Sequence, residues 1–476
     1  MKLLFLNKKQ NNIIGELSPK IIRQYNKKRS VKNRQIICHA PFKSLTFFFG
    51  GKVMACWHNK QYLIGQIPEN TIEEIWFGEK LKKLREHIIA NNLSLGCFEC
   101  DKNIQNGFYT SAGAWRYDYL PEAKSEFPVS IDFQTSNQCN NECIMCIGEY
   151  SSAIRMHREK KNNYRNPYGK EFIQQLELFI PHLKEASFSG GEVFLSEHYF
   201  EIWEKFAQIN PDIVVSVTTN GTVVNDRVRS LLNKLKFNIN ISIDSLDKNV
   251  FERIRKNSQL DIVLSNLQYF IHYTQSKNTN LSVRVNVMQQ NYPQIPELIK
   301  YLNNQNIRIH FNQVIFPPYS ALWSSDESIL NRIIELYQKE RLETNTTIQQ
   351  GNNQAWNDFI NQIKQWKKMS VQHAQILQTH KNTSIDKLVE FLLCRIKDNL
   401  KSNSCFALNE KDLFITFVKT TLDQCQSEIN NDELFKRAII FYLTMPINRL
   451  IDEFNIRDTE SLIEFTKQAG TYKISI

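Results

Sequence analysis

The sequence predicts an α/β protein: a core of parallel βα units, with a small cysteine-bearing module before it and an all-helical domain after it. Between residues 129 and 315, short β-branched runs alternate with amphipathic helical stretches, which is typical of parallel βα units. Four cysteines enclose the segment 38–100, ahead of these units. After residue 325, strand-like alternation almost disappears.

The composition is that of a globular protein with a large core. The chain has 476 residues, of which 42% are hydrophobic and 23% are charged, so two or three domains are expected. No apolar run approaches the length that crosses a bilayer, and the run at Met1–Leu6 is too short for a signal peptide. We therefore expect a cytoplasmic protein with no membrane partner.

The N-terminal segment 1–35 is polar and basic, and we expect it to form an arm or a short cap. Its densest basic run is Lys27–Arg34, in a chain whose net charge of +10 is modest for its length. Such a run is usually a solvated face, so nucleic acid is not the expected partner. Contact with nucleic acid or with an acidic partner is the alternative.

A compact module is expected over residues 36–105. A hairpin turns at Gly50-Gly51, and the capping-box pair Thr71 and Glu74 begins a helix that runs to about Leu84. The cysteines that bracket this unit fit a structural zinc site or an iron–sulfur cluster; they are Cys38, Cys56, Cys97 and Cys100. Because a bound metal also supplies folding energy, loss of one ligand is expected to destabilise residues 36–100 and leave the next domain folded.

The domain 125–320 should hold the βα units. Strands are expected at about 129–135, 186–190, 213–219, 238–244, 281–288 and 307–315. The helices expected between them include Phe172–Leu183, Phe200–Ile209, Arg227–Leu235, Ile262–Thr274 and Ile295–Leu302. In such domains ligands bind at the C-terminal ends of the strands, which makes these ends the place to search for a site.

The C-terminal domain, 325–476, is expected to be helical and carries no recognisable catalytic motif. Helices are predicted at about 327–342, 355–369, 386–400, 410–428 and 432–453. Trp356 and Trp366 are interpreted as core residues rather than ligand contacts. Cys394, Cys405 and Cys425 do not show ligand-like spacing, and we expect no third metal site from them.

Three cysteines follow the first predicted strand, in the stretch Cys139-Asn140-Asn141-Glu142-Cys143-Ile144-Met145-Cys146. Their C-x3-C-x2-C spacing suits three corners of one iron–sulfur cube, for which thiolates are the usual protein ligands. A cube has four irons, so three ligands leave one iron open. An open metal position is where chemistry becomes possible.

Together with three downstream stretches, this motif resembles the radical S-adenosylmethionine (radical SAM) enzymes. The later strand ends Ser189-Gly190-Gly191-Glu192, Thr218-Thr219-Asn220-Gly221 and Ser242-Ile243-Asp244 resemble, in order, the family's GGE turn, its TNG turn and its fourth strand. Met145 departs from the aromatic residue that many members carry before the third cysteine. The resemblance implies a partial (β/α)6 barrel and covers about the first two-thirds of the chain.

In that family the open iron binds the methionine part of SAM. Reductive cleavage then gives methionine and a 5′-deoxyadenosyl radical, which abstracts hydrogen from a substrate. By resemblance, Cys139, Cys143 and Cys146 are the cluster ligands and catalytic residues. Gly190 and Gly191 would let the backbone approach SAM closely.

Each of the other residues assigned to cofactor binding also has a second interpretation. Glu192 would contact the SAM ammonium group, or would be a solvated acid at a helix start. Ser242 and Asp244 share one face of the fourth strand and would point into the barrel toward the SAM ribose or carboxylate, or would cap the strand end. Asn220 would bind the cofactor or only form its turn.

The four-cysteine module resembles the SPASM and twitch modules of radical SAM enzymes. The order of cysteine, glycine hairpin, cysteine, Glu-Ile-Trp helix and C-x2-C carries that resemblance. Such modules usually follow the catalytic domain, and here the module precedes it, as in one subgroup. By resemblance, Cys38, Cys56, Cys97 and Cys100 would fully ligate an auxiliary iron–sulfur cluster, and zinc is the alternative. Such a cluster would either relay electrons or have a purely structural role.

The resemblance implies a radical SAM enzyme that modifies a peptide or protein substrate. Modules of this kind often accompany peptide-modifying enzymes, and a flavodoxin- or ferredoxin-type protein would donate the electron. One alternative is a radical SAM enzyme that acts on RNA, suggested by the basic run. The other is a non-catalytic zinc-binding interaction protein.

Overall fold

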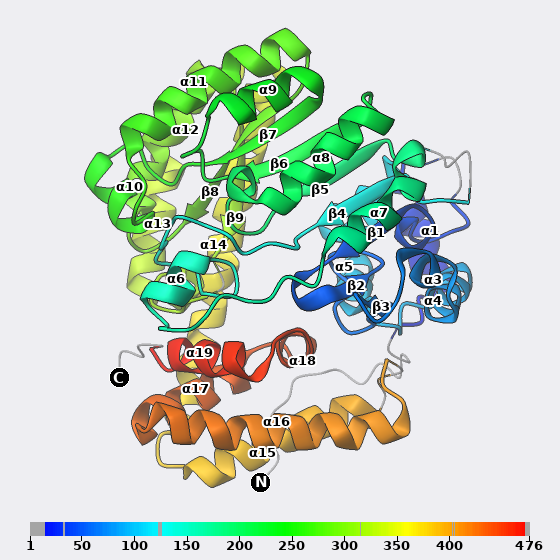
Figure 1. Cartoon of the computed structure of the whole chain (residues 1–476). Helices are drawn as coiled ribbons and strands as arrows, with labels where there is room; N and C mark the ends of the chain where they lie inside the picture. The colour runs from blue at the N-terminus through cyan, green and yellow to red at the C-terminus, as the bar shows by residue number, and fades with distance from the viewer. Residues whose placement is uncertain are drawn as a thin grey trace.

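The computed structural model describes residues 15–471 except 32–33, 122–125, 315, 402 and 404. Within these residues the centre is one nine-stranded sheet in the order β3-β2-β1-β4-β5-β6-β7-β8-β9 (Figure 1). Strand β1 and strands β4 to β9 are parallel, and β2 and β3 are antiparallel additions at one edge. The strands are β1 (Ser44–Phe47), β2 (Lys52–Met54), β3 (Gly65–Gln66), β4 (Ser130–Phe133), β5 (Glu185–Phe188), β6 (Val214–Thr219), β7 (Lys236–Ser242), β8 (Leu281–Val287) and β9 (Arg308–Gln313).

Helices connect and cover the strands. Those of the module and barrel are α1 (Pro19–Lys28), α2 (Ala40–Lys43), α3 (Ile72–Phe77), α4 (Glu79–Ile89), α5 (Phe98–Gln105), the 3-10 helix η3 (Gly113–Asp118), α6 (Ser152–His157), α7 (Lys170–Phe179), α8 (Glu197–Ile209), α9 (Asp226–Lys234), α10 (Lys248–Ile254), α11 (Leu260–Lys277) and α12 (Ile295–Asn304). After the sheet come α13 (Glu327–Lys339), α14 (Thr347–His380), α15 (Ile385–Lys401), α16 (Leu408–Ile429), α17 (Asp432–Thr444), α18 (Ile447–Ile456) and α19 (Thr459–Ala469).

All six strands predicted for the βα domain are present, each within a few residues of its predicted bounds. In β6, for example, Val215 and Val217 are buried completely, whereas Ser216 and Thr218 between them are only partly buried. Successive side chains of a strand point to opposite faces, so the apolar set packs under the helices and the polar set lines the other face. Mixed α/β architecture with a parallel sheet and a helical C-terminal region is therefore confirmed.

The cysteine module is joined to the barrel more closely than its sequence indicates. Strand β1 of the module pairs in parallel with β4, with Leu45 opposite Ile131. One hydrophobic core runs through both parts without interruption. The hairpin predicted around Gly50-Gly51 is present as the β1–β2 pair.

Part of the predicted basic arm packs on this module. Residues 1–14 of the arm, and Lys32 and Asn33 of its basic run, lie outside the described residues. Helix α1 buries Tyr25 completely, and the guanidinium of Arg29, which is 1% exposed, donates two hydrogen bonds to Asp118 at 2.7 and 2.5 Å. Arg29 is thus a buried structural residue and does not belong to a solvated basic face.

Several helices differ from their predicted lengths. The helix predicted from Thr71 to Leu84 is broken at Gly78, where an added Cβ would lie 2.3 Å from the Glu74 carbonyl oxygen. The last predicted helix, 432–453, is two helices separated at Met445-Pro446, because proline cannot continue a helix from the turn before it. Helix α19 was not predicted.

The helical C-terminal region is divided between two cores. Helices α13 and α14 pack on the core of the barrel, where Trp356 and Trp366 are buried as predicted. Helices α15 to α19 form a second core and a separate layer beside the cysteine-loop end of the barrel (Figure 1). No helix of the described chain combines the length and apolar character needed to span a membrane.

Candidate functional site

The loop that carries Cys139, Cys143 and Cys146 leaves the C-terminal end of β4 and leads into α6. It is held on two sides by backbone hydrogen bonds. The Cys139 N–H donates to Ser152 Oγ at 3.0 Å, and the Ile144 N–H donates to the Ile254 carbonyl at 2.9 Å. The loop is therefore anchored both to its own following helix and to the end of α10.

The three thiols lie close enough to affect one another. Burial raises the pKa of Cys139 to about 12, and the neighbouring Cys143 adds to the shift. Burial also raises the pKa of Cys146, with Cys143 and Cys139 contributing. The buried guanidinium of Arg255 acts in the opposite direction on Cys143. Three thiols gathered beside one buried cation are a donor set suited to an anionic iron–sulfur cluster.

The Gly190-Gly191 turn packs against the cysteine loop. Both residues have positive φ, of 88° and 56°. A Cβ on Gly191 would lie 2.3 Å from the Gln138 carbonyl oxygen, and one on Gly190 would lie 2.8 Å from the Ser136 carbonyl oxygen. The close approach that these glycines allow is thus to the backbone of the cysteine loop. The structure neither adds to nor removes their assigned role in SAM binding, which stays a prediction.

Glu192 is completely buried at the end of β5. Its carboxylate accepts hydrogen bonds from Thr219 Oγ1 at 2.6 Å and from the Asn220 N–H at 2.6 Å. Burial raises its pKa, and these hydrogen bonds oppose that shift. Glu192 is therefore not solvated, although its carboxylate also accepts a hydrogen bond from the Phe194 N–H at 3.1 Å, at the start of a short 3-10 helix. Its carboxylate joins the end of β5 to the turn after β6.

Asn220 continues this network toward the cysteines. Its Nδ2 donates to Asn140 Oδ1 at 2.9 Å, and its Oδ1 accepts from the Thr222 N–H at 2.9 Å. Asn220 therefore does more than form its own turn, because it fixes the loop between Cys139 and Cys143. Together, Glu192 and Asn220 hold three strand ends in one arrangement.

Asp244 and Ser242, predicted on one strand face, have different surroundings. Asp244 is completely buried, with Oδ2 2.8 Å from Arg255 Nε and Oδ1 accepting from the Asn286 N–H at 2.7 Å. Ser242 ends β7 and is half-buried. Asp244 thus positions Arg255 beside the thiols. The sequence analysis did not identify Arg255, because this residue lies outside every recognised motif.

The four module cysteines meet around one small cavity, which all four line. Backbone amides donate to Cys38 from Ala40, to Cys56 from His58 and Asn59, and to Cys100 from Gly113 and Ala114. The Asn59 side chain donates to Cys97 at 3.4 Å. Amide donors on each sulfur are the surroundings that tune iron–sulfur clusters. Among the described residues, no three or more His, Cys, Asp or Glu side chains are arranged around the position of a single metal ion, and the four cysteines are no exception.

Cys405, set aside in the sequence reading, lies against this module. Its Sγ is 3.6 Å from the Ser94 carbonyl oxygen. Burial raises the pKa of Cys97, and the nearby Cys405 thiol adds a small part to that rise. It comes from the segment before α16, more than 300 residues downstream. No local spacing could have indicated this contact.

The inner face of the barrel holds a polar cavity of about 680 Å³ that the sequence reading also missed. Its strand residues come from seven strands: Thr46, Asp132, Ser187, Ser216, Thr218, Asn240, Arg284 and Asn312 among them. Parallel strands buried on both faces are normally continuously apolar. The strict polar alternation in these strands was the available signal for a solvated interior.

This geometry defines a class of protein: an α/β barrel that presents a three-cysteine cluster loop at its strand ends, with a second cysteine set at its edge. Residues 133–311 match the Radical SAM superfamily, and residues 38–101 match SPASM, an iron–sulfur cluster-binding domain. The chain therefore carries a radical SAM domain preceded by a SPASM domain. The first implies a [4Fe–4S] cluster with SAM, and the second implies auxiliary iron–sulfur binding.

Curated relatives align with only part of this chain, and only part of each relative is aligned. GTP 3′,8-cyclase of Listeria welshimeri is 24% identical over 38% of this chain and 52% of its own length. The GTP 3′,8-cyclase of Staphylococcus epidermidis is 28% identical over 27% of this chain and 37% of its own. The chain thus spans about half the length of these relatives or less.

Two solved structures are similar to part of this chain. Streptococcus suis SuiB bound to precursor peptide SuiA has 18% identity, covers 50% of each chain and gives a TM-score of 0.33. Native anSMEcpe with bound AdoMet has 16% identity, with 44% of this chain and 60% of that chain covered and a TM-score of 0.34.

Proposed function

We propose that this protein is a radical SAM enzyme that modifies a peptide or protein substrate held in the barrel cavity. One observation carries the proposal: the cavity is lined both from the strand ends that lead to one cysteine set and from the module that carries the other. Gln134 and Ser189, at the strand ends that lead to the cysteine loop and the Gly-Gly turn, line one part of it. Trp57 and Arg116, from the module side, line another.

The module cysteines come close to this cavity. Burial raises the pKa of Cys56 to about 11, and the cavity residues Asp132 and Arg116 are near enough to add smaller effects in opposite directions. Cys56 also directly precedes the cavity residue Trp57. A substrate bound here would lie next to both cysteine sets, which suits a reaction that removes a hydrogen atom and then an electron.

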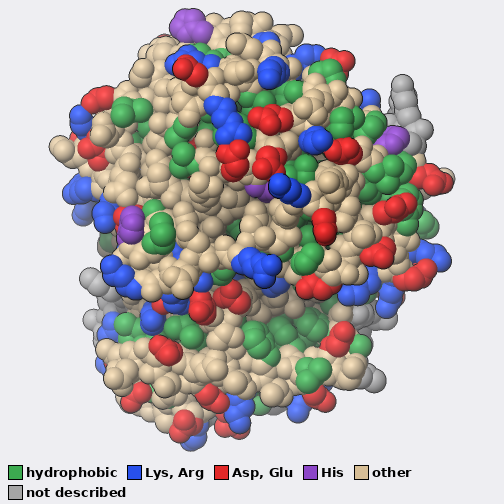
Figure 2. Space-filling view, viewed as in Figure 1, with side chains coloured by type: hydrophobic (Ala, Val, Ile, Leu, Met, Phe, Trp, Pro, Cys, Tyr) green, Lys and Arg blue, Asp and Glu red, His purple; other side chains and the backbone are tan. Residues whose placement is uncertain are grey.

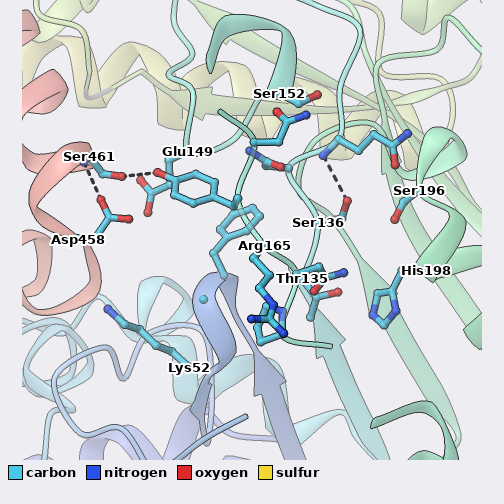
Figure 3. A pocket seen from close by; sticks show the side chains of 18 of the residues that line it. Lys52, Thr135, Ser136, Glu149, Ser152, Arg165, Ser196, His198, Asp458 and Ser461 are labelled. Carbon is cyan, nitrogen blue, oxygen red and sulfur yellow. Dashed lines mark hydrogen bonds between the residues drawn. The ribbon is translucent and has the colours of Figure 1, made fainter. Parts of the chain in front are cut away.

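A second cavity, of about 700 Å³, favours a polymeric substrate (Figure 3). It lies beside the end of β4, where Thr135 and Ser136 line it directly after the barrel-cavity residue Gln134. Its other walls come from the module at Lys52 and from the C-terminal layer at Asp458. Two cavities on adjoining residues offer more room than one small molecule needs.

The expected chemistry divides between cofactor and chain. A bound cluster would supply the electron that cleaves SAM, with a flavodoxin- or ferredoxin-type protein as its source. The chain itself would position the ligands through Glu192, Asn220 and Arg255, and the C-terminal layer would keep water from the loop. Tyr164 on the loop side and Ser461 on α19 are hydrogen-bonded at 2.7 Å across that boundary.

Activation of SAM cleavage by candidate substrates tests the proposal. Anaerobically reconstituted full-length protein, with SAM and dithionite, is incubated with a synthetic peptide library or with GTP. We expect 5′-deoxyadenosine release to rise above the substrate-free rate with a subset of the peptides. Stimulation by GTP alone would replace the peptide assignment. Absence of any SAM cleavage would remove the enzymatic proposal itself.

A nucleotide substrate is the second candidate, because GTP 3′,8-cyclases are among the curated relatives. The RNA alternative has less support in the structure. Arg29 of the basic run is buried in an ion pair, and basic and acidic side chains are interspersed on the face shown in Figure 2. The zinc-only alternative is opposed by the matches to two iron–sulfur domain types.

A further inference from the structure

Arg284 is the residue of the barrel cavity that lacks a charge partner. It lies in the middle of β8, opposite Ser242 on β7 and His310 on β9. Its Nε is buried and has no hydrogen-bond partner among the residues that the structure describes. Burial lowers its pKa, and the positive charge of Arg116 adds to that effect. The residue as a whole is half-buried, so its guanidinium faces the polar cavity without an anion and can bind one.

The other charged residues of the cavity either form an ion pair or have a pKa shifted toward the neutral form. Arg116 Nη2 lies 2.9 Å from Asp132 Oδ1 and donates to Ser187 Oγ at 3.2 Å. Burial raises the pKa of Glu185, whose Oε1 accepts a hydrogen bond from Ser130 at 3.1 Å. Asp132 thus pairs with Arg116 through Oδ1, its Oδ2 has no hydrogen-bond partner, and no described carboxylate forms an ion pair with Arg284.

Neutral polar side chains lie on the two strands next to this cation. Asn240 and Asn312 line the same cavity as Arg284, on the strands to either side. Asn240 Oδ1 already accepts from Ser282 Oγ at 2.6 Å, and its Nδ2 donates to the Val217 carbonyl. These hydrogen bonds occupy the Asn240 amide and leave the charge of Arg284 without a counter-ion among the described residues. An oxyanion is the ligand that a planar guanidinium binds best.

We propose that Arg284 is a specificity-determining residue that binds an oxyanion of the substrate inside the barrel. The oxyanion is either the carboxylate of an acidic peptide residue or the phosphate of a nucleotide. Arg116, held by Asp132, forms the second positive wall of this subsite. The inference rests on the proposed function, since it assigns the barrel cavity to the substrate.

Binding of charged and neutral probe pairs tests the subsite. Full-length reconstituted protein with SAM is titrated by calorimetry with acetyl-Ala-Glu-Ala-amide against its Gln counterpart, and with GTP against guanosine. We expect one charged probe to bind more tightly than its neutral counterpart, by about tenfold to a hundredfold. Arg284→Gln should abolish that preference. Arg332→Gln, at an exposed position on α13, removes the same charge elsewhere and should keep it.

The outcomes separate the subsite from the proposed function. An Arg284-dependent preference for the glutamate peptide supports both. An Arg284-dependent preference for GTP supports the subsite and overturns the peptide assignment. Equal preference in Arg284→Gln and wild type, or no binding of either charged probe, overturns the subsite and leaves the peptide proposal to the SAM-cleavage assay.

Thermal unfolding gives a readout that does not depend on the probes. Because no described carboxylate forms an ion pair with Arg284, its loss breaks no ion pair, and Arg284→Gln should unfold without ligand at the wild-type temperature or above it. A melting temperature several degrees below that of both wild type and Arg332→Gln would make Arg284 a structural residue and overturn the proposal.

Discussion

Buried charges at single residues hold the cysteine loop in place. Glu192, Asp244 and Arg255 are each almost fully buried, and each has a partner from another strand end or loop. The sequence identified Glu192 and Asp244 because recognised turns contain them. Arg255 could not be found that way, since only the folded chain brings the end of α10 under the loop.

Removing Arg255 should destabilise the protein strongly. Arg255→Gln leaves the Asp244 carboxylate buried without its cation, which typically costs about 3–5 kcal/mol. Urea unfolding of the cluster-free protein measures the loss. The Asp244→Asn, Arg255→Gln double variant should recover part of it, because neither charge then remains. A double variant less stable than both single variants would contradict the ion-pair account.

Glu192→Ala should weaken SAM binding, by about 1.5–3 kcal/mol if a charge-assisted hydrogen bond is lost. Calorimetry with the cluster-loaded protein measures the affinity. Thr219→Val is the matched control, because it removes one hydrogen bond to the carboxylate and leaves the charge. Equal SAM affinity in Glu192→Ala and wild type would remove Glu192 from the cofactor site.

At the scale of elements, the alternation of apolar and polar residues predicted the strands well, but it predicted only part of the strand pairing. Alternation predicted β4 to β9 because each strand has one apolar and one polar face. The pairing of β1 with β4 joins segments more than 80 residues apart and has no local signal. Helix ends were predicted less well, as at Gly78, where the backbone turns away from the preceding helix and leaves no room for a Cβ beside the Glu74 carbonyl. The three-cysteine site was the most predictable part, because its ligands share one short loop.

The Gly191 turn gives an element-scale prediction. Gly191→Ala should distort the cysteine loop, because its φ is 56° and its Cβ would lie 2.3 Å from the Gln138 carbonyl oxygen. Gly50→Ala is the control: its φ is 66°, and nothing lies within 4 Å of an added Cβ. We expect Gly50→Ala to lose only about 1–2 kcal/mol of stability. Gly191→Ala should lose more and incorporate less iron, and equal behaviour of the two variants would contradict this packing.

At the scale of the molecule, the two hydrophobic cores do not coincide with the domains that the sequence motifs indicated. Module and barrel share one core, and α15 to α19 form the other. The second core is attached to both parts of the first. Lys52 Nζ donates to the Asn455 carbonyl at 3.1 Å, and Arg155 pairs with Glu460 at 2.8 Å. The sequence indicated a helical domain, but these contacts depend on residues about 300 to 400 positions apart.

This division into two cores changes the effect on stability that we expect when a module cysteine is replaced. Cys97→Ala should lower the iron content from about eight to about four per chain if both cysteine sets bind four-iron clusters. About four irons with one zinc in the wild type would instead indicate a structural module. Sequence alone suggested that only residues 36–100 would be destabilised. Because β1 is hydrogen-bonded to β4 within one continuous core, we now expect the barrel to be destabilised with the module.

Hydrogen exchange of Cys97→Ala distinguishes these two outcomes. Amides of β1, β4 and β5 should lose protection together, because opening the module exposes the β4 edge of the sheet. Amides of α16 and α17, in the second core, should keep most of theirs. Loss of protection confined to residues 36–100 would show that the module opens by itself and that the shared core does not couple it to the barrel.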